Sequence, residues 1–209
     1  MNLLSALDIL FPIYRIGCVF LPCFIYQYFS LRKKQEKIFI SSMLWRFIFL
    51  FYLYLVIDVT GVGTLEDLLS YPELIRPEEI NLVPFQSGVG LLNLLNIIMF
   101  TPLGFLLPLV WKQCRKPVVS VLLGFQFSLM IELLQLFNRR TTDIDDLLMN
   151  TLGAFVGFLI WLLYRKLINK TPKEIQSFSQ REPQIYLILS LAGVFFLYHW
   201  RFFLELAYF

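Results

Sequence analysis

The chain has 209 residues, of which 58% are hydrophobic and 16% are charged, and its formal net charge is +3. Soluble domains average about 45–50% apolar and about 25% charged residues, so this composition excludes a soluble globular protein such as a cytosolic nucleotide-binding enzyme. Three cysteines without CxxC spacing and a single histidine also exclude a disulfide-framed secreted domain and a histidine-based metal site.

Six apolar stretches are long enough to cross a bilayer as helices, which predicts an all-α, polytopic membrane helical bundle. In chain order they cover 9–31, 38–59, 91–111, 118–137, 147–164 and 185–206. The first stretch carries Arg15 and no small-residue cleavage site, so we expect a retained helix rather than a signal peptide. The predicted organisation is two N-terminal transmembrane helices (1–59), an extracytoplasmic loop (60–90), a three-helix core (91–164), a cytoplasmic basic loop (165–184) and a C-terminal transmembrane helix (185–209).

Basic residues gather on alternate loops, which predicts the orientation of the chain. Loops 32–37, 112–117 and 165–184 hold twelve Lys or Arg residues and three Glu, which sums to +9. Loops 60–90 and 138–146 hold three Arg and eight acidic residues, which sums to −5. We therefore expect the basic loops in the cytoplasm, with both termini and the acidic loops outside.

The long loop 60–90 cannot form one helix, because Gly61, Gly63 and three prolines interrupt it. Its leucines predict a short amphipathic piece on the membrane surface, and a plain connecting loop is the alternative.

Polar residues enter the third and fourth predicted spans on one helical face each. Asn93 and Asn96 are three residues apart, as are Glu132 and Gln135. Intramembrane polar groups usually face the bundle interior and mark a site. The alternatives are interhelical hydrogen bonding for the asparagines, and for Glu132 an ion pair with an intramembrane arginine: Arg15, Arg46 or Arg201.

The fifth predicted span begins with Asp143, Asp146 and Asn150 on one face. An ordinary helix start is the alternative, with Thr142 as the N-cap, acidic residues in the first turn and Arg140 paired locally. Further along, a Gly-x-x-x-Gly pattern at 153–157 predicts close packing against another helix.

The predicted topology places these three polar faces at one depth, in the outer half of the membrane. We therefore expect one polar pocket open to the outer leaflet, with Arg139 or Arg140 at its mouth. Arginine suits phosphate or carboxylate recognition, and the carboxylates suit a cation or an amine. No cofactor or metal is expected and no catalytic residue is assigned. The candidate pocket residues are Asn93, Asn96, Glu132, Gln135, Arg140, Asp143, Asp146 and Asn150.

Four short blocks between residues 81 and 160 resemble the VanZ-like family in content and order. They are 81–85 (NLVPF), 96–104 (NIIMFTPLG), 131–135 (IELLQ) and 140–153 (RTTDIDD, then NTLG). The resemblance makes 91–164 a VanZ-like core. The family's characteristic positions correspond to Asn96, Pro102, Gly104, Glu132, Gln135, Arg140, Asp143, Asp146, Asn150 and Gly153.

The resemblance implies a multi-pass protein of the bacterial cytoplasmic membrane, related to an accessory protein of glycopeptide resistance clusters. It implies low-level resistance to teicoplanin, a lipid-tailed glycopeptide, rather than remodelling of the wall precursor. No nucleic acid partner is expected, and the oligomeric state is left open.

Three hypotheses for function remain from the sequence. The first is a non-enzymatic envelope protein whose pocket binds membrane lipids, lipid-linked cell-wall intermediates or lipoglycopeptide antibiotics. The second is an intramembrane enzyme acting on a lipid-linked or phosphorylated envelope substrate, with Glu132 as general base and Asp143 with Asp146 holding a divalent cation. The third is a transporter of amphipathic molecules, with a path lined by Arg15, Arg46, Arg201 and Glu205.

Overall fold

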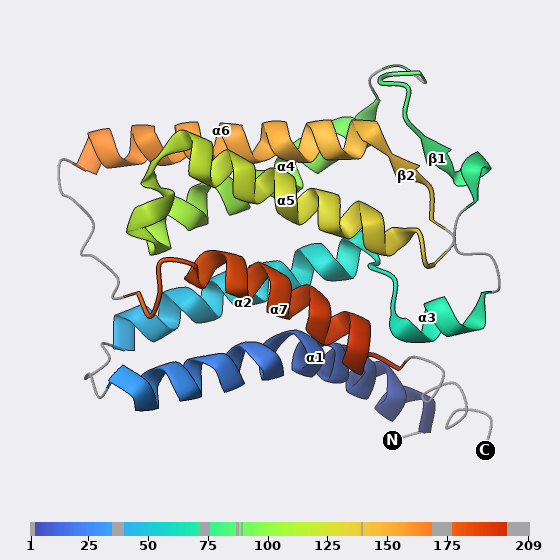
Figure 1. Ribbon diagram of the computed structural model, residues 1–209, viewed down its shortest axis with the longest axis horizontal. Coiled ribbons are helices and arrows are strands. Elements are labelled where there is room, and N and C mark those ends of the chain that lie inside the picture. Colours follow the sequence, from blue (N-terminus) through green and yellow to red (C-terminus); the bar gives the residue numbers. More distant parts are fainter. Residues whose placement is uncertain are drawn as a thin grey trace.

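The structure is a computed structural model, and it describes residues 3–34, 40–71, 76–86, 88, 90–138, 140–168 and 177–199 (Figure 1). Six helices form the body of the molecule: α1 (Leu3–Lys34), α2 (Ile40–Thr60), α4 (Leu91–Val110), α5 (Pro117–Gln135), α6 (Ile144–Ile168) and α7 (Glu182–Leu197). The shorter elements are α3 (Leu65–Ser70), the 3₁₀ turns η1 (Pro77–Glu79) and η2 (Lys112–Arg115), and the strands β1 (Ile80–Asn81) and β2 (Thr142–Asp143).

The predicted membrane helical bundle is confirmed. Five helical segments of the described chain are long and apolar enough to cross a membrane. The sixth helix, α7, has 16 residues, which is about 24 Å at ~1.5 Å per residue and shorter than the ~30 Å hydrocarbon core. Residues 200–206 of the predicted sixth span, with Arg201, lie outside the described residues, as does Glu205.

The long helices run side by side, so their ends form two opposite poles (Figure 1). We call the pole with α3, β1 and β2 the acidic end, because it carries Glu66, Asp67, Glu78 and Glu79. The pole with η2 is the basic end, and it carries Arg32, Lys33, Lys112, Arg115, Lys116, Arg165, Lys166 and Arg181. The start of α1 and the end of α7 lie at the acidic end. Which end faces the outside, and where the termini lie, stays a prediction from the charges.

Glycines bring the backbones of α4 and α6 into direct contact. A Cβ placed on Gly157 would overlap the carbonyl oxygen of Thr101, and one on Gly104 would overlap that of Ala154. Gly153 approaches α4 in the same way, which confirms the predicted packing role of the Gly-x-x-x-Gly pattern. This contact fixes the spacing of the two helices that carry Asn93, Asn96, Asp146 and Asn150, half of the candidate pocket residues.

Replacing Gly157 with Ala is expected to lower the free energy of unfolding by about 1–3 kcal/mol, because the added methyl must push α4 and α6 apart. Thermal unfolding of the detergent-purified protein measures the change. Gly17 is the matched control, since a Cβ there meets nothing within 4 Å. Gly17→Ala should be neutral or stabilise the helix by up to about 1 kcal/mol, and equal melting temperatures for the two variants would contradict the close α4–α6 contact.

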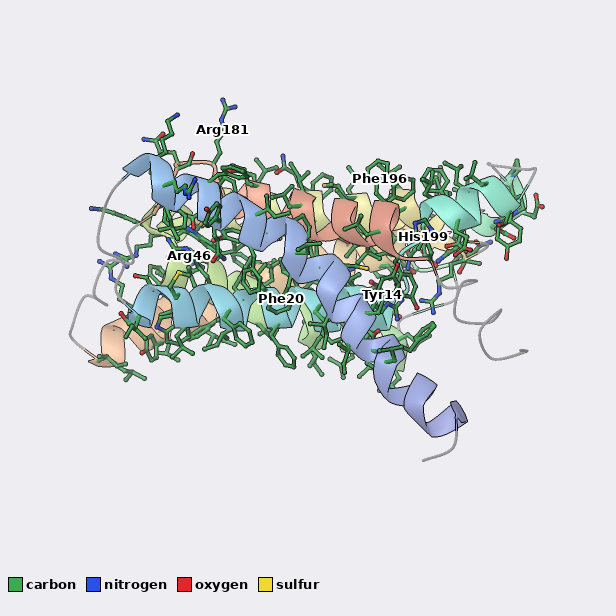
Figure 2. The ribbon with its side chains drawn as sticks, turned by 90° about the horizontal axis from the view of Figure 1, so that it is seen from below. Tyr14, Phe20, Arg46, Arg181, Phe196 and His199 are labelled. Atoms are coloured by element: carbon green, nitrogen blue, oxygen red, sulfur yellow. The ribbon has the colours of Figure 1, made fainter. Side chains whose placement is uncertain are left out.

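Two intramembrane arginines pair with acidic residues far away in the sequence. Arg15 Nη1 lies 2.5 Å from Asp58 Oδ1, and Arg46 Nε lies 2.7 Å from Glu182 Oε1. Figure 2 shows Arg46 within the bundle near the basic end. The alternative that Glu132 pairs with Arg15 or Arg46 is therefore wrong, and Arg201 is outside the described residues.

Candidate functional site

Two short strands bring the loops of the acidic end together. β1 pairs with β2 in parallel, with Ile80 opposite Thr142 and Asn81 opposite Asp143. The Asn81 amide Nδ2 donates to both carboxylate oxygens of Asp143, at 3.3 and 3.2 Å. The backbone N–H of Phe85 donates to Asp145 Oδ1 at 2.8 Å. Loop 76–86 is thus fixed to the start of α6.

Asp143 serves as the cap of α6. It directly precedes Ile144, and its Oδ1 accepts the backbone N–H of Asp145 at 2.9 Å, the geometry of an N-cap side chain. The prediction that Thr142 is the N-cap is wrong: its hydroxyl donates instead to the carbonyl oxygen of Glu132, at 3.2 Å. The cap is Asp143 because β2 extends through that residue and α6 begins directly after it, at Ile144.

A cavity of about 510 Å³ lies at the acidic end, among α2, α4, α5 and α6. It joins polar residues from four helices and the loop before α6 with apolar residues of α2 and α4. Six of the eight candidate pocket residues line it: Asn96, Glu132, Gln135, Arg140, Asp146 and Asn150. The other two, Asn93 and Asp143, are not among its lining residues.

Asn93 has a local role at the start of α4. Its Oδ1 accepts the backbone N–H of Gly90 at 2.9 Å, which satisfies a donor that precedes the first turn of the helix. Asn96, one turn further on, donates to Asp146 Oδ1 at 2.6 Å and so links α4 to α6. The two asparagines share a face in sequence but have separate functions.

The inner wall of the cavity presents hydrogen-bond acceptors. Glu132 is 4% exposed, and in the described part of the chain its carboxylate accepts one hydrogen bond, from the backbone N–H of Asp143 at 3.2 Å. Gln135 donates to the Thr60 carbonyl oxygen at 2.7 Å, and Asn150 donates to Ser128 Oγ at 2.9 Å. The amide oxygens of Gln135 and Asn150 are buried without a donor among the described residues. A buried acceptor without a donor costs about 1–3 kcal/mol, so both oxygens are unsatisfied acceptors of residues that line the cavity.

Arg140 supplies the positive charge of the cavity. Its Nη1 donates to the Thr60 carbonyl oxygen at 2.5 Å, and the ion pairs found among the described residues do not include it. The expected local pairing of Arg140 with the neighbouring acids is therefore wrong. Gly61, at φ +60°, makes room for this guanidinium, because a Cβ there would lie 2.8 Å from Cζ. Arg139, the other candidate for the mouth, is outside the described residues.

The outer wall of the cavity is apolar and faces away from the bundle. Leu92 is 75% exposed and Val59 is 67% exposed, and Leu95 and Ile98 are exposed as well. On a membrane-spanning chain such side chains face lipid, so the cavity opens sideways between α2 and α4. Toward the basic end, the Tyr52 hydroxyl donates to the Met99 carbonyl oxygen at 2.9 Å and ties these two helices together.

The arrangement suits the binding of a polar group better than metal chemistry. In the part of the chain that the structure describes, no three His, Cys, Asp or Glu side chains are grouped to hold a metal ion. Asp143 and Asp146, the proposed cation ligands, already accept amide hydrogen bonds.

Cys114 in η2, at the basic end, is fully buried. Burial raises the pKa of its thiol to about 12, which keeps the thiol protonated.

Sequence reasoning missed several residues that build this region. Ser128 is four residues before Glu132 on the same face of α5, so helical periodicity was a usable signal for it. Thr60 contributes a backbone carbonyl, for which side-chain patterns give no signal. Asn81 is placed by the pairing of β1 with β2, and strands of two residues have no measurable periodicity. Asp145 accepts the backbone N–H of Phe85, 60 residues away in the sequence.

The part of the chain that contains the cavity is similar to known proteins. The family model described as VanZ/LLP1 matches residues 38–165, which include every residue that lines the cavity. Protein VanZ of Enterococcus faecium is 33% identical over 97 residues, an alignment that covers 44% of this chain and 57% of that protein. The matched part of the chain thus spans little more than half of that relative's length. No solved structure matches the chain.

Proposed function

The chain belongs to the VanZ/LLP1 family, and from this premise we propose that it is a protein of the bacterial cytoplasmic membrane whose cavity binds the polar headgroup of an amphipathic molecule. By this binding it lowers susceptibility to lipoglycopeptide antibiotics such as teicoplanin. The observation that carries the proposal is the cavity itself, which combines a lateral apolar opening with a charged, acceptor-rich wall.

The two walls suit the two parts of an amphipathic ligand. Exposed Leu92 and Leu95 leave room for an acyl chain that stays in the bilayer, while Arg140 attracts an anionic group. Glu132 and the free amide oxygens of the inner wall accept hydrogen bonds from amines or hydroxyls. The volume of about 510 Å³ lies in the range of small-molecule sites. Membrane lipids, lipid-linked cell-wall intermediates and lipoglycopeptides all have this chemistry.

The charge distribution favours an outward-facing site. The cavity is at the acidic end, and the acidic loops belong outside by the positive-inside rule. A ligand would therefore enter from the outer leaflet, where teicoplanin meets the cell. The enzymatic alternative keeps Glu132 as its general base at the cavity wall, but its cation ligands Asp143 and Asp146 already accept amide hydrogen bonds, and Asp143 does not line the cavity.

The lateral opening gives the direct test. Leu95→Trp places an indole at the opening of the cavity, so we expect the teicoplanin concentration that inhibits growth to fall at least about fourfold relative to cells with the wild-type protein, because a lost contact of about 1 kcal/mol is worth roughly fivefold in binding. Susceptible bacteria that express each variant at equal membrane level provide the measurement.

Leu94→Trp is the matched control. Leu94 is 51% exposed and Leu95 is 48% exposed, but Leu94 does not line the cavity. This variant should protect as well as the wild-type protein. Equal protection by both variants would remove lateral entry from the proposal, and a wild-type protein without any effect on teicoplanin susceptibility would overturn the function itself.

A further inference from the structure

A second cavity, of about 350 Å³, lies beside the first at the acidic end. Arg140 lines both cavities, and Arg15 from α1 lines the second. The remaining lining residues come from α1, the segment 61–67, the turn after α5 and the residue after α7: Phe11, Gly61, Val62, Thr64, Asp67, Asn138 and Tyr198. Arg15 and Tyr198 are outside the region 38–165 that the family model matches.

Arg15 is held with donor capacity to spare. Its Nη1 is 2.5 Å from Asp58 Oδ1, and its Cζ lies 4.9 Å from the centroid of the Tyr198 ring. Its Nε is buried without an acceptor among the described residues. A guanidinium has five N–H donors, so this arginine keeps unused donors beside the cavity.

Aromatic contacts keep this wall in place. The Tyr198 ring stacks on the Tyr14 ring and contacts the Phe11 ring edge-on, with 5.7 Å between the ring centroids in both pairs. The Tyr14 hydroxyl donates to the Leu197 carbonyl oxygen, and the backbone N–H of His199 donates to Tyr14 at 3.2 Å. Figure 2 shows Tyr14 and His199 close together at this end. The end of α7 is thereby fixed against α1, and with it the ring on which Arg15 lies.

The residues that line the second cavity carry two positive charges and one negative charge. Two guanidiniums line it, and the one carboxylate among its lining residues, Asp67, accepts hydrogen bonds from the Thr64 backbone N–H and hydroxyl, both at 2.8 Å. Asp58 neutralises part of Arg15 from outside the lining. Two like charges that share a cavity repel each other, and an anion with several oxygens relieves this repulsion while it accepts the spare donors.

We propose that the second cavity binds a phosphate group between Arg15 and Arg140. Phosphate fits because its tetrahedral oxygens can accept from both planar guanidiniums at once. The group can belong to a lipid headgroup at the membrane surface or to free phosphate. This site shares Arg140 with the proposed function but goes beyond it, because it adds residues of α1 and the residue after α7 and does not use Glu132 or the lateral opening.

The full chain, purified in maltoside micelles, is titrated with dihexanoyl phosphatidic acid, with inorganic phosphate and with uncharged dihexanoylglycerol, and binding is measured calorimetrically. Arg15→Gln should weaken binding of the phosphate-bearing probes about tenfold, the effect of losing a charge-assisted hydrogen bond. Asp58→Asn should strengthen binding of these probes several-fold, because the substitution removes the carboxylate that competes with phosphate for Arg15. The double variant Arg15→Gln/Asp58→Asn should bind the phosphate-bearing probes as weakly as Arg15→Gln does. Arg15→Lys should bind them more tightly than Arg15→Gln and less tightly than the wild-type protein.

The two probes separate the two sources of phosphate. Binding of both indicates that the phosphate group alone is sufficient, and binding of phosphatidic acid only assigns the site to a lipid headgroup; either result supports the site. Wild-type affinity in Arg15→Gln, or tighter binding of the uncharged lipid than of phosphatidic acid, overturns it. Leu95→Trp should bind phosphate normally, so failure of this site and failure of the proposed function are distinguishable.

Discussion

Glu132→Gln is expected to abolish protection against teicoplanin and to return the inhibitory concentration to that of cells without the protein. The substitution keeps the size of the side chain and an oxygen that can accept the Asp143 backbone N–H, so the loop between α5 and α6 should keep its conformation. It replaces one carboxyl oxygen of a side chain that is 4% exposed at the wall of the cavity with an amide NH2, which cannot accept a hydrogen bond. A buried ligand donor left without its acceptor costs about 1–3 kcal/mol, which is roughly five- to 150-fold in ligand affinity.

The control for this variant is Glu78→Gln, an isosteric change of an exposed residue in η1 at the same end of the molecule. It should protect like the wild-type protein. Immunoblots of membrane fractions establish that both variants accumulate equally. Full protection by Glu132→Gln would show that the carboxyl group in the cavity has no part in resistance.

Asp143→Asn tests a different property, although the sequence groups Asp143 with Glu132. Its carboxylate caps α6 and accepts hydrogen bonds from the Asn81 side-chain amide. Loss of protection in this variant would therefore report a displaced loop as readily as a lost ligand contact. In the structure Asp143 does not line the cavity. It holds the loop and the start of α6 that carry the lining residues Arg140 and Asp146.

The helices were predictable because each follows from local composition. An apolar run of about 20 residues has few alternatives to a spanning helix. Helical spacing also brings Glu132 and Gln135 to one face of α5, and Asp146 and Asn150 to one face of α6, and these four residues line the same cavity. Helical periodicity was therefore sufficient to predict that these four residues lie at one site.

The loops were not predictable because their contacts join segments far apart in the chain. Asn81 and Asp143 are 62 residues apart, and Arg140 and Thr60 are 80 residues apart. Asn93 shows a different limit: its helical spacing from Asn96 is regular, but the free N–H groups before the first turn of α4 compete for its side chain. Helical periodicity says which face a residue occupies, not which hydrogen bond it makes.

Breaking the buried ion pair at the basic end is expected to have the largest effect on stability. Arg46 is 1% exposed and Glu182 is 0% exposed. Glu182 also accepts from the Ser177 hydroxyl at 2.8 Å and the Phe178 backbone N–H at 2.6 Å, so it fixes the start of α7. Arg46→Met leaves this carboxylate buried without its cation, and we expect a loss of about 3–5 kcal/mol in the free energy of unfolding. Reversible unfolding in mixed detergent micelles, followed by circular dichroism, measures it.

The double variant Arg46→Met/Glu182→Gln separates the pairing from the packing. Because it removes both charges, it should recover most of the stability that Arg46→Met loses. Asp58→Asn is the control for an ion pair near the surface, where Asp58 is 40% exposed, and it should cost about 1 kcal/mol or less. A small loss in Arg46→Met, similar to that of Asp58→Asn, would mean that water reaches Glu182. A large loss that the double variant does not recover would mean that Arg46 acts mainly through its contact with the Phe178 ring, whose centroid lies 4.3 Å from Cζ, rather than through its ion pair with Glu182.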